Sequence, residues 1–366
     1  MAPQSGARQG PLQGLRIVEF AGLGPAPFAC MLLADMGAEV VLVDRPGARA
    51  GDPLQIVNRG RTLVQADLKN AQDRERIGEL IDRADVLVEG FRPGVMERLG
   101  LGPEVARQRN PRLVYARMTG WGQDGPLAQA AGHDINYIAI TGALAAIGTP
   151  ERPVVPLNLV GDFGGGSLYL VAGILAAVLE ARSSGQGQVV DAAITDGVIS
   201  LMTLFLSQQQ RGDFQDRRES NLLDGGAPWY GVYRTADDRY VSLGALEPQF
   251  FAVFCERSGL DPLWQEKRKD KAQWPALRQA LTQLLGARTQ AQWTALFEGS
   301  DACLSPVLPL GEAAAHAHNQ ARQSFVAVDH VLHPAPAPRF SRTPSAHPSA
   351  PPREAECLQA VLRSWQ

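Results

Sequence analysis

Patterns typical of buried strands and of helices alternate along the first 200 residues of the chain. Continuous apolar runs rich in valine, isoleucine and leucine predict buried strands at residues 15–20, 40–43, 85–89 and 113–117. Apolar residues recur at helical spacing over residues 28–36, which stop at Gly37, and over residues 74–83. Because strands that alternate with helices form parallel sheets covered on both faces, the pattern predicts an α/β fold, with a Rossmann-like large domain built on a parallel sheet.

The pattern changes after this first part. A helix, a strand and a second helix are predicted in turn over residues 164–182, 188–191 and 192–206. Two candidate strands around Asp237-Asp238 predict a hairpin within residues 230–245. Further helices are predicted over residues 250–258, 274–285 and 291–297. We therefore expect a large Rossmann-like domain, a polar linker, a smaller α+β domain and a C-terminal segment, at residues 1–205, 206–223, 224–318 and 319–366.

Composition and charge exclude several classes of function. The 366 residues carry a net charge of −3, which gives no electrostatic reason to expect nucleic acid or an anionic membrane as a partner. Residues 1–10 are polar and lack the apolar core of a secretory signal, and the apolar stretch 168–179 is too short to span a bilayer, so it predicts a buried helix. The four scattered cysteines match neither a metal site nor a disulfide framework, and we expect a cytoplasmic protein without a bound metal.

The candidate catalytic residues lie in two short polar segments, each beside an apolar run. His133 lies in Gly132-His133-Asp134, and Asp162 lies in Gly161-Asp162-Phe163. An imidazole and a carboxyl group held apart can act as two bases, one removing a proton from a carbon acid and the other returning one. The alternative is that each residue merely caps a helix.

A nucleotide-bearing ligand is suggested by the ends of the predicted strands. Gly22-Leu-Gly24 follows the first strand and Asp44 ends the second, but Pro27 occupies the third glycine position of the dinucleotide fingerprint, which disfavours NAD or FAD. Arg45 and Arg92 follow strands directly, where ligands of open α/β sheets bind, and could hold phosphates. The alternative is a set of solvated surface cations.

Several motifs together resemble one family. They include AGHDINYIAITGAL, NLVGDFGGGS, GQGQVVDAAITDG, DGGAPWYGVY and EPQFF, and they extend from Leu15 almost to the end of the chain. In these motifs the chain resembles the family III CoA-transferase superfamily, and within it the branch of α-methylacyl-CoA racemases.

The resemblance implies a role for residues at matching positions. His133 and Asp162 would be the catalytic bases, and Glu247 would orient His133 from the other subunit. Residues around the thioester would be Gly132, Asp134, Tyr137 and Asn158. The CoA moiety would be held by Arg45, Ala66, Asp67, Leu68, Lys69, Gly90, Phe91, Arg92 and Arg98. The family also implies an interlocked homodimer in which the C-terminal segment returns to the large domain.

The implied reaction interconverts (R)- and (S)-2-methylacyl-CoA thioesters through an enolate, with no cofactor because CoA is part of the substrate. Asp162 must be protonated when it donates; burial favours that form, whereas the N-terminus of a following helix opposes it. The backbone N–H of Asp134 could bind the enolate oxygen, or its side chain could cap a helix. Residues 164–166, all glycine, allow close approach or a flexible helix entry.

The rival function is a CoA-transferase with Asp162 as the nucleophile. His133 would then have no evident task. The acyl chain of the substrate does not follow from the sequence.

Overall fold

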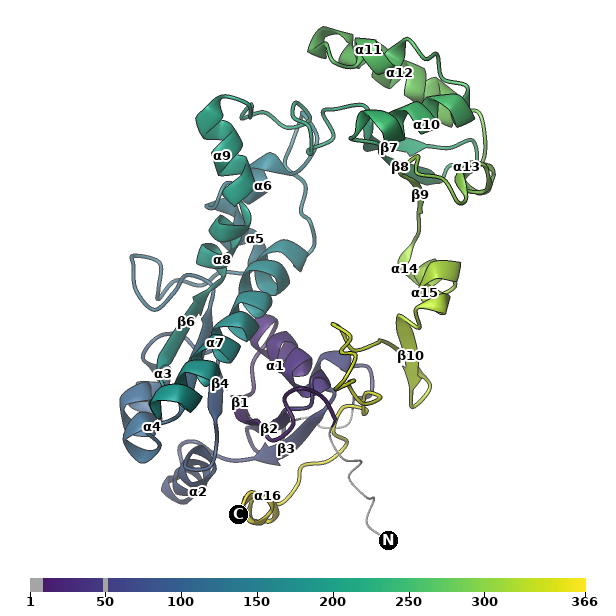
Figure 1. Cartoon of the computed structure of the whole chain (residues 1–366). Helices are drawn as coiled ribbons and strands as arrows, with labels where there is room; N and C mark the ends of the chain where they lie inside the picture. Colours follow the sequence, from purple (N-terminus) through teal and green to yellow (C-terminus); the bar gives the residue numbers. More distant parts are fainter. Residues whose placement is uncertain (1–8, 49–51) are drawn as a thin grey trace. The chain divides into compact units, whose positions relative to one another are not determined.

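The computed structural model describes residues 9–48 and 52–366, so residues 1–8 of the expected large domain lie outside the described residues. The chain divides into two compact units (Figure 1). The first unit contains Met1–Ala143, Pro156–Met202 and Ala321–Gln366. The second unit contains Leu144–Val155 and Thr203–Gln320.

Two of the expected domain boundaries need correction. Residues 144–155, which we placed in the large domain, belong to the second unit. The expected linker 206–223 also belongs to the second unit, and its first residues complete helix α9 (Thr203–Arg211). Glutamine and arginine are good helix formers, so the polar run at 208–211 continues the helix instead of ending it.

A six-stranded parallel sheet forms the centre of the first unit. Its strands are β1 (Arg16–Phe20), β2 (Glu39–Asp44), β3 (Arg61–Gln65), β4 (Val86–Glu89), β5 (Val114–Thr119) and β6 (Val189–Ala193). They lie in the order β3-β2-β1-β4-β5-β6, and every neighbouring pair is parallel. This order confirms the predicted Rossmann-like α/β fold.

Strand β3 is the one strand of this sheet that the sequence pattern did not predict. It begins with Arg61, whose Nε donates to Glu19 on β1 at 2.9 Å, and both side chains are fully buried. A buried ion pair breaks the continuous apolar pattern by which buried strands are predicted, because the two charges satisfy each other only after the sheet has formed.

Helices cover both faces of the sheet. One face packs against α2 (Ala71–Ile81), α4 (Pro103–Arg109) and α16 (Leu358–Ser364), through a core that includes Val18 and Phe20 of β1. The other face carries α1 (Pro25–Asp35) and α7 (Leu168–Ser184), which contact each other (Figure 1). Shorter helices are η1 (Ile56–Asn58), α3 (Val95–Arg98), α5 (Asp134–Ala139) and α8 (Ile194–Leu201).

The predicted helix over 164–182 differs in an important way. It begins five residues earlier, as a π-helix η2 (Leu159–Ser167) that continues into α7. The combined run Leu159–Ser184 is apolar and long enough to cross a membrane by length and composition, a property that core helices also have, and 39% of its most apolar window is buried. The expectation of a buried helix at residues 168–179 holds for one side of the helix only: Leu170 and Ile174 are buried, whereas Leu168 and Leu179 are more than half exposed. The predicted helix over 192–206 is divided between α8 and α9 at Met202.

The second unit is built on an antiparallel sheet. Its strands are β7 (Tyr230–Arg234), β8 (Tyr240–Gly244) and β9 (Leu304–Val307), in the order β7-β8-β9. Besides α9, its helices are α6 (Ala143–Ala146), α10 (Pro248–Ser258), α11 (Trp264–Lys267), η3 (Lys271–Gln273), α12 (Trp274–Leu285), α13 (Gln290–Phe297), α14 (Leu310–Ala313) and α15 (Ala317–Ala321). The first residue of α6, Ala143, and the last residue of α15, Ala321, are counted with the first unit. The predicted hairpin and three predicted helices are confirmed.

The C-terminal segment forms part of the first unit. A hairpin of β10 (Phe325–Val328) and β11 (Val331–Pro334) is followed by a chain that runs without helix or strand as far as α16. The hydrogen bonds that hold it include those from Arg59 Nη1 to Pro334 O, from the Glu356 N–H to Leu63 O and from Arg16 Nη1 to Trp365 O, each at 2.7 Å. The segment thus closes over β1 and β3.

Candidate active site

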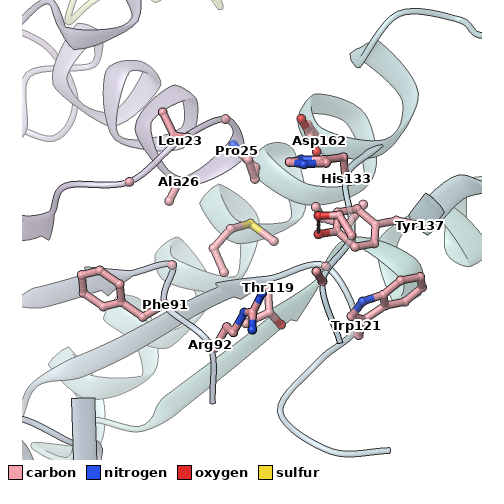
Figure 2. Close-up of a pocket in the computed structure, with 18 of the residues that line it drawn as sticks. Leu23, Pro25, Ala26, Phe91, Arg92, Thr119, Trp121, His133, Tyr137 and Asp162 are labelled. Atoms are coloured by element: carbon pink, nitrogen blue, oxygen red, sulfur yellow. Dashed lines mark hydrogen bonds between the residues drawn. The ribbon is translucent and has the colours of Figure 1, made fainter. Parts of the chain in front are cut away.

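A pocket of about 590 Å³ opens at the carboxyl ends of β1, β4, β5 and β6. This is where the strand order reverses, the position at which open α/β sheets bind ligands. Its wall is made by the turns that follow the strands and by α5 and η2 (Figure 2). The lining residues that bear on the chemistry are Gly24, Pro25, Arg92, Trp121, His133, Tyr137 and Asp162.

His133 is held at the start of α5. It is the N-cap residue, in extended conformation, and its backbone N–H donates to Asn136 Oδ1 at 3.1 Å. This leaves the imidazole exposed at the pocket wall, where Figure 2 shows it close to Asp162 and Pro25. The helix-capping alternative is therefore true of the His133 backbone, while its ring remains available for chemistry.

Asp162 lies inside the π-helix η2, not before a helix as the sequence suggested. Its side chain is half-buried, and Asn158 Nδ2 donates to Asp162 Oδ2 at 3.3 Å. Burial is the main cause that raises the pKa of Asp162 above its usual value; the Asn158 hydrogen bond and the nearby His133 act in the opposite direction. Gly24 of the first turn approaches the carboxyl group, since a Cβ there would lie 3.3 Å from Oδ2. π-Helical turns occur frequently at functional sites.

Asp134 links the two candidate bases. It is the first residue of α5, it is buried, and its Oδ1 accepts the backbone N–H of Asp162 at 2.6 Å. Its side chain therefore does not cap its own helix, as one alternative held. The backbone N–H of Asp134 has no acceptor within residues 9–48 and 52–366, which leaves it free for an anionic ligand.

Tyr137 shapes the wall of the pocket. Its hydroxyl donates to Gly132 O, and its ring meets Trp121 edge to face, with ring centres 4.8 Å apart. Gly120 and Gly132 leave room for that ring, because a Cβ at either position would lie within 2.7 Å of it. Tyr137 thus fixes the turn that carries His133, and its hydroxyl is already engaged.

The glycines that follow Asp162 serve helix packing. A Cβ on Gly165 would lie 2.5 Å from Val198 Cγ2 of α8, and a Cβ on Gly197 of α8 would lie 1.8 Å from Gly165 O. Phe163 stacks on Phe28 of α1, with ring centres 4.3 Å apart. Of our two interpretations of residues 164–166, close approach is confirmed, with α8 as the neighbour, whereas a flexible helix entry is wrong because the glycines lie within a helix.

The turn after β4 brings three predicted CoA-binding residues to the pocket: Gly90, Phe91 and Arg92. This turn is held by the side chain of Glu89, which is buried and accepts a hydrogen bond from the Phe91 N–H at 2.8 Å. Arg117 bridges Glu89 and Glu97, at 2.8 Å from each. Burial raises the pKa of Glu89.

The other predicted CoA-binding residues lie along the same edge of the sheet, outside the pocket wall. Arg45 follows β2 and is exposed; the Ala66 N–H donates to Asp44 O at 2.9 Å, which joins the turns after β2 and β3. Asp67 Oδ1 accepts the Lys69 N–H at 2.9 Å. Leu68 packs on the core beside Phe91, and Arg98 is exposed, with its guanidinium close to Gly94.

Glu247 lies in the second unit, as the N-cap residue of α10. Arg268 Nη1 and Nη2 donate at 3.0 Å to the carbonyl oxygens of Ala245 and Leu246, the two residues that precede it. The orienting role of Glu247 thus stays a prediction.

Sequence reasoning missed some residues of the site. Trp121 and Thr119 line the pocket and could have been found, because they follow a predicted strand at the edge where ligands bind. Gly24 was considered only as part of a dinucleotide fingerprint. The side chain of Asp134, and the pair of Glu89 and Arg117, leave no sequence signal because their partners are distant in the chain.

Within the described ranges, no three His, Cys, Asp or Glu side chains lie together as a candidate metal site. The titratable side chains in the pocket wall include His133 and Asp162.

Comparisons with known proteins agree with the motifs. Residues 12–356 match the model of CoA-transferase family III. The chain is 44% identical to the alpha-methylacyl-CoA racemase of Mus musculus over 97% of this chain and 93% of that protein. It is 42% identical to the alpha-methylacyl-CoA racemase of Homo sapiens over 91% of this chain and 87% of that protein.

A solved structure agrees with the fold. The CAIB/BAIF family protein from Brucella suis has a TM-score of 0.83 and 24% sequence identity, over 98% of this chain and all of that one. The family resemblance of the motifs is thereby confirmed, and the chain belongs to CoA-transferase family III.

Proposed function

We propose that this protein is a racemase of 2-methylacyl-CoA thioesters. The observation that carries the proposal is the placement of His133 and Asp162 in the wall of one pocket at the carboxyl edge of the sheet. The identity of 42–44% to two alpha-methylacyl-CoA racemases, over at least 91% of the chain, supports it.

The two side chains suit the two halves of a proton exchange. The α-hydrogen of a thioester is weakly acidic, and its removal leaves an enolate whose charge lies mainly on the thioester oxygen. His133 is exposed at the pocket wall, and its imidazole can serve as a proton acceptor or donor. Burial raises the pKa of Asp162, which favours the protonated form that a donor needs. Each base would act on one face of the α-carbon.

The developing oxyanion needs a hydrogen-bond donor. The free backbone N–H of Asp134 is next to His133, and one such donor is typically worth about 3 kcal/mol in the transition state. Asn158 stays bound to Asp162 and helps to fix its carboxyl group.

The CoA portion would lie along the edge of the sheet. Arg92 lines the pocket, and Arg45 and Lys69 follow β2 and β3 at the same edge. Exposed cations there suit phosphate groups. The turn residues Ala66–Lys69 and Gly90–Arg92 would give backbone contacts, and Arg98 would add a further cation.

A second copy of the chain would complete the site. Helices α7 and α8 of the first unit leave large apolar side chains exposed, as expected of a surface that another subunit covers. They include Leu168, Leu179, Ile199 and Leu201. In the proposed interlocked homodimer, Glu247 of one subunit would accept a hydrogen bond from His133 of the other.

Acid–base side chains alone complete this cycle, so we propose that the enzyme works without a metal, flavin or nicotinamide. The four cysteines are unpaired in the structure, two of them buried, which suits the reducing cytoplasm that we expected.

CoA transfer is the second candidate, since the family is named for it. Asp162 would then attack the thioester and form a mixed anhydride, with CoA leaving as the thiolate. The presence of His133 in the same pocket favours the racemase, because acyl transfer needs no second base.

The deciding experiment uses a single-epimer 2-methylacyl-CoA in deuterated water. The wild-type protein should epimerise it and place deuterium at the α-carbon. His133→Ala should lose exchange from one epimer far more than from the other, and Asp162→Ala should show the reverse preference.

A transferase would give a different result. Acyl transfer to an added carboxylate would then require Asp162, with His133→Ala nearly silent and no deuterium at the α-carbon. An Asp162 adduct trapped by hydroxylamine, without exchange, would overturn the proposal.

A further inference from the structure

The side chain of Asp134 is held between the two candidate bases. Asp134 has 8% of its surface exposed, although it directly follows His133, whose ring is exposed. Its Oδ1 accepts the Asp162 N–H at 2.6 Å, which joins the start of α5 to the π-helix η2. A Cβ on Gly161 would lie 2.2 Å from the same oxygen, so the contact between the two elements depends on a glycine at that position.

The second carboxyl oxygen of Asp134 has an unusual environment. Oδ2 is buried and has no hydrogen-bond partner among the residues that the structure describes. A buried polar atom without a partner is destabilising, and more so when it is charged. An asparagine could accept the same hydrogen bond, so that hydrogen bond alone does not account for a carboxyl group at this position.

That charge is close to Asp162. The groups that act on the Asp162 carboxyl are Asp134 and His133, while Tyr137 is a third titratable neighbour from α5. The helices α1 and α8, which also contact η2, present uncharged side chains to it, among them Phe28 and Val198. Burial also raises the pKa of Asp134, while its hydrogen bond from the Asp162 N–H acts in the opposite direction. When Asp134 is ionised it is the negative group of this set, and a like charge favours the neutral form of a carboxyl group.

We propose that Asp134 is a positioning residue that fixes the Asp162 backbone against the His133-bearing helix and, by its negative charge, favours the proton-bearing form of Asp162. This role belongs to the side chain and is separate from that of the Asp134 backbone N–H. It deepens the proposed racemase function and rests on it only for the kinetic part of the test. Burial raises the pKa of Asp162 in the same direction.

The two parts of the role can be separated by two variants. Asp134→Asn keeps the shape and an oxygen that accepts the Asp162 N–H, but removes the charge. Asp134→Ala removes both. Glu104→Gln, at an exposed position in the first turn of α4, is a matched control for the loss of one negative charge.

The first measurement needs no substrate. The aspartate carboxyl carbons are titrated by ¹³C NMR in otherwise wild-type protein, and the Asp162 signal is assigned from Asp162→Asn. The midpoint of Asp162 should fall by about one pH unit in Asp134→Asn, a shift typical of one nearby charge. It should not move in Glu104→Gln. An unchanged midpoint in Asp134→Asn would overturn the proposal, whatever reaction the protein catalyses.

The second measurement follows α-deuterium exchange from each epimer against pH. In Asp134→Asn, the pH limb of the Asp162-dependent direction should move to lower pH by a similar amount, while the other direction keeps its limb. A purely structural role would lower both directions equally without moving either limb. If the wild-type protein catalyses no exchange, the proposed function fails, and the NMR titration still decides the role of Asp134.

Discussion

A single methyl group on α8 should disturb the site through its packing. Gly197 lies against the π-helix η2, and its Cβ would be 1.8 Å from Gly165 O, where ordinary contact begins at 3.4 Å. Gly197→Ala therefore requires the two backbones to separate by about 1.6 Å. Backbone atoms cannot rotate away as a flexible side chain can, so η2 or α8 must move as a unit.

The magnitude follows from two opposing effects. Overpacking of a well-filled core costs about 1–3 kcal/mol, whereas alanine gains about 1 kcal/mol over glycine in a helix. The net result is a destabilisation of up to about 2 kcal/mol, which lowers the melting temperature by roughly 4 °C for a unit of this size. Because η2 carries Asp162, a displacement near 1 Å should also lower turnover by about 100-fold.

Thermal unfolding and α-deuterium exchange would be measured on the same samples. Gly311→Ala is the matched control, because Gly311 is in α14 with no atom within 4 Å of the added methyl group, and it should be neutral or slightly stabilising. Equal melting temperatures and equal turnover in the two variants would refute the argument that glycine at 197 serves close packing.

Further predictions concern charge. Asp162→Asn should lose epimerisation but be more stable than wild type at neutral pH. Because the pKa of Asp162 is raised by folding, ionisation weakens the wild-type fold as pH rises through that pKa, and the difference in stability should vanish in acid, below the ordinary value of 3.8. A gain that persists in acid would contradict this. Glu247→Gln should lower turnover with little effect on KM, and a normal turnover would exclude the orienting role. Arg92→Ala should raise KM for the thioester about 10-fold and leave kcat unchanged, measured by initial rates; an unchanged KM would remove Arg92 from the binding site. Chelated, cofactor-stripped protein should keep its rate, and a rate restored only by added metal or NAD would be evidence against the proposed mechanism.

The sequence predicted most of the large sheet because its strands are buried on both faces and are apolar without interruption. β3 was not predicted because it begins with Arg61, whose burial depends on an ion pair with Glu19, 42 positions away. Such a pair has no local pattern, since each charge becomes acceptable only once the other is in place. The boundaries of the second unit were not predicted for a related reason: residues 144–155 belong to it through contacts with residues that are distant in the sequence.

The candidate bases were visible as polar breaks beside apolar runs, but the residues that hold them were not. Arg117 is a strand residue that bridges Glu89 and Glu97 beneath the pocket. Asp134 was considered for its backbone, and its side-chain contact with Asp162 spans 28 positions. Supporting residues of this kind are defined by tertiary contacts, and no spacing in the sequence marks them.

The segment Gly161-Asp162-Phe163-Gly164-Gly165-Gly166 shows that a sequence motif does not identify the structural neighbours of its residues. From the sequence alone, the glycines after Asp162 allow close approach, but the neighbour that approaches them is not named. The structure gives Gly165 to α8 and Gly161 to Asp134, while Asp162 faces the pocket between them. In the proposed reaction, the glycines would act through the position of the backbone that carries Asp162. Bulk added at these positions should be felt first as a loss of stability and of Asp162-dependent exchange, with affinity for the CoA portion unchanged.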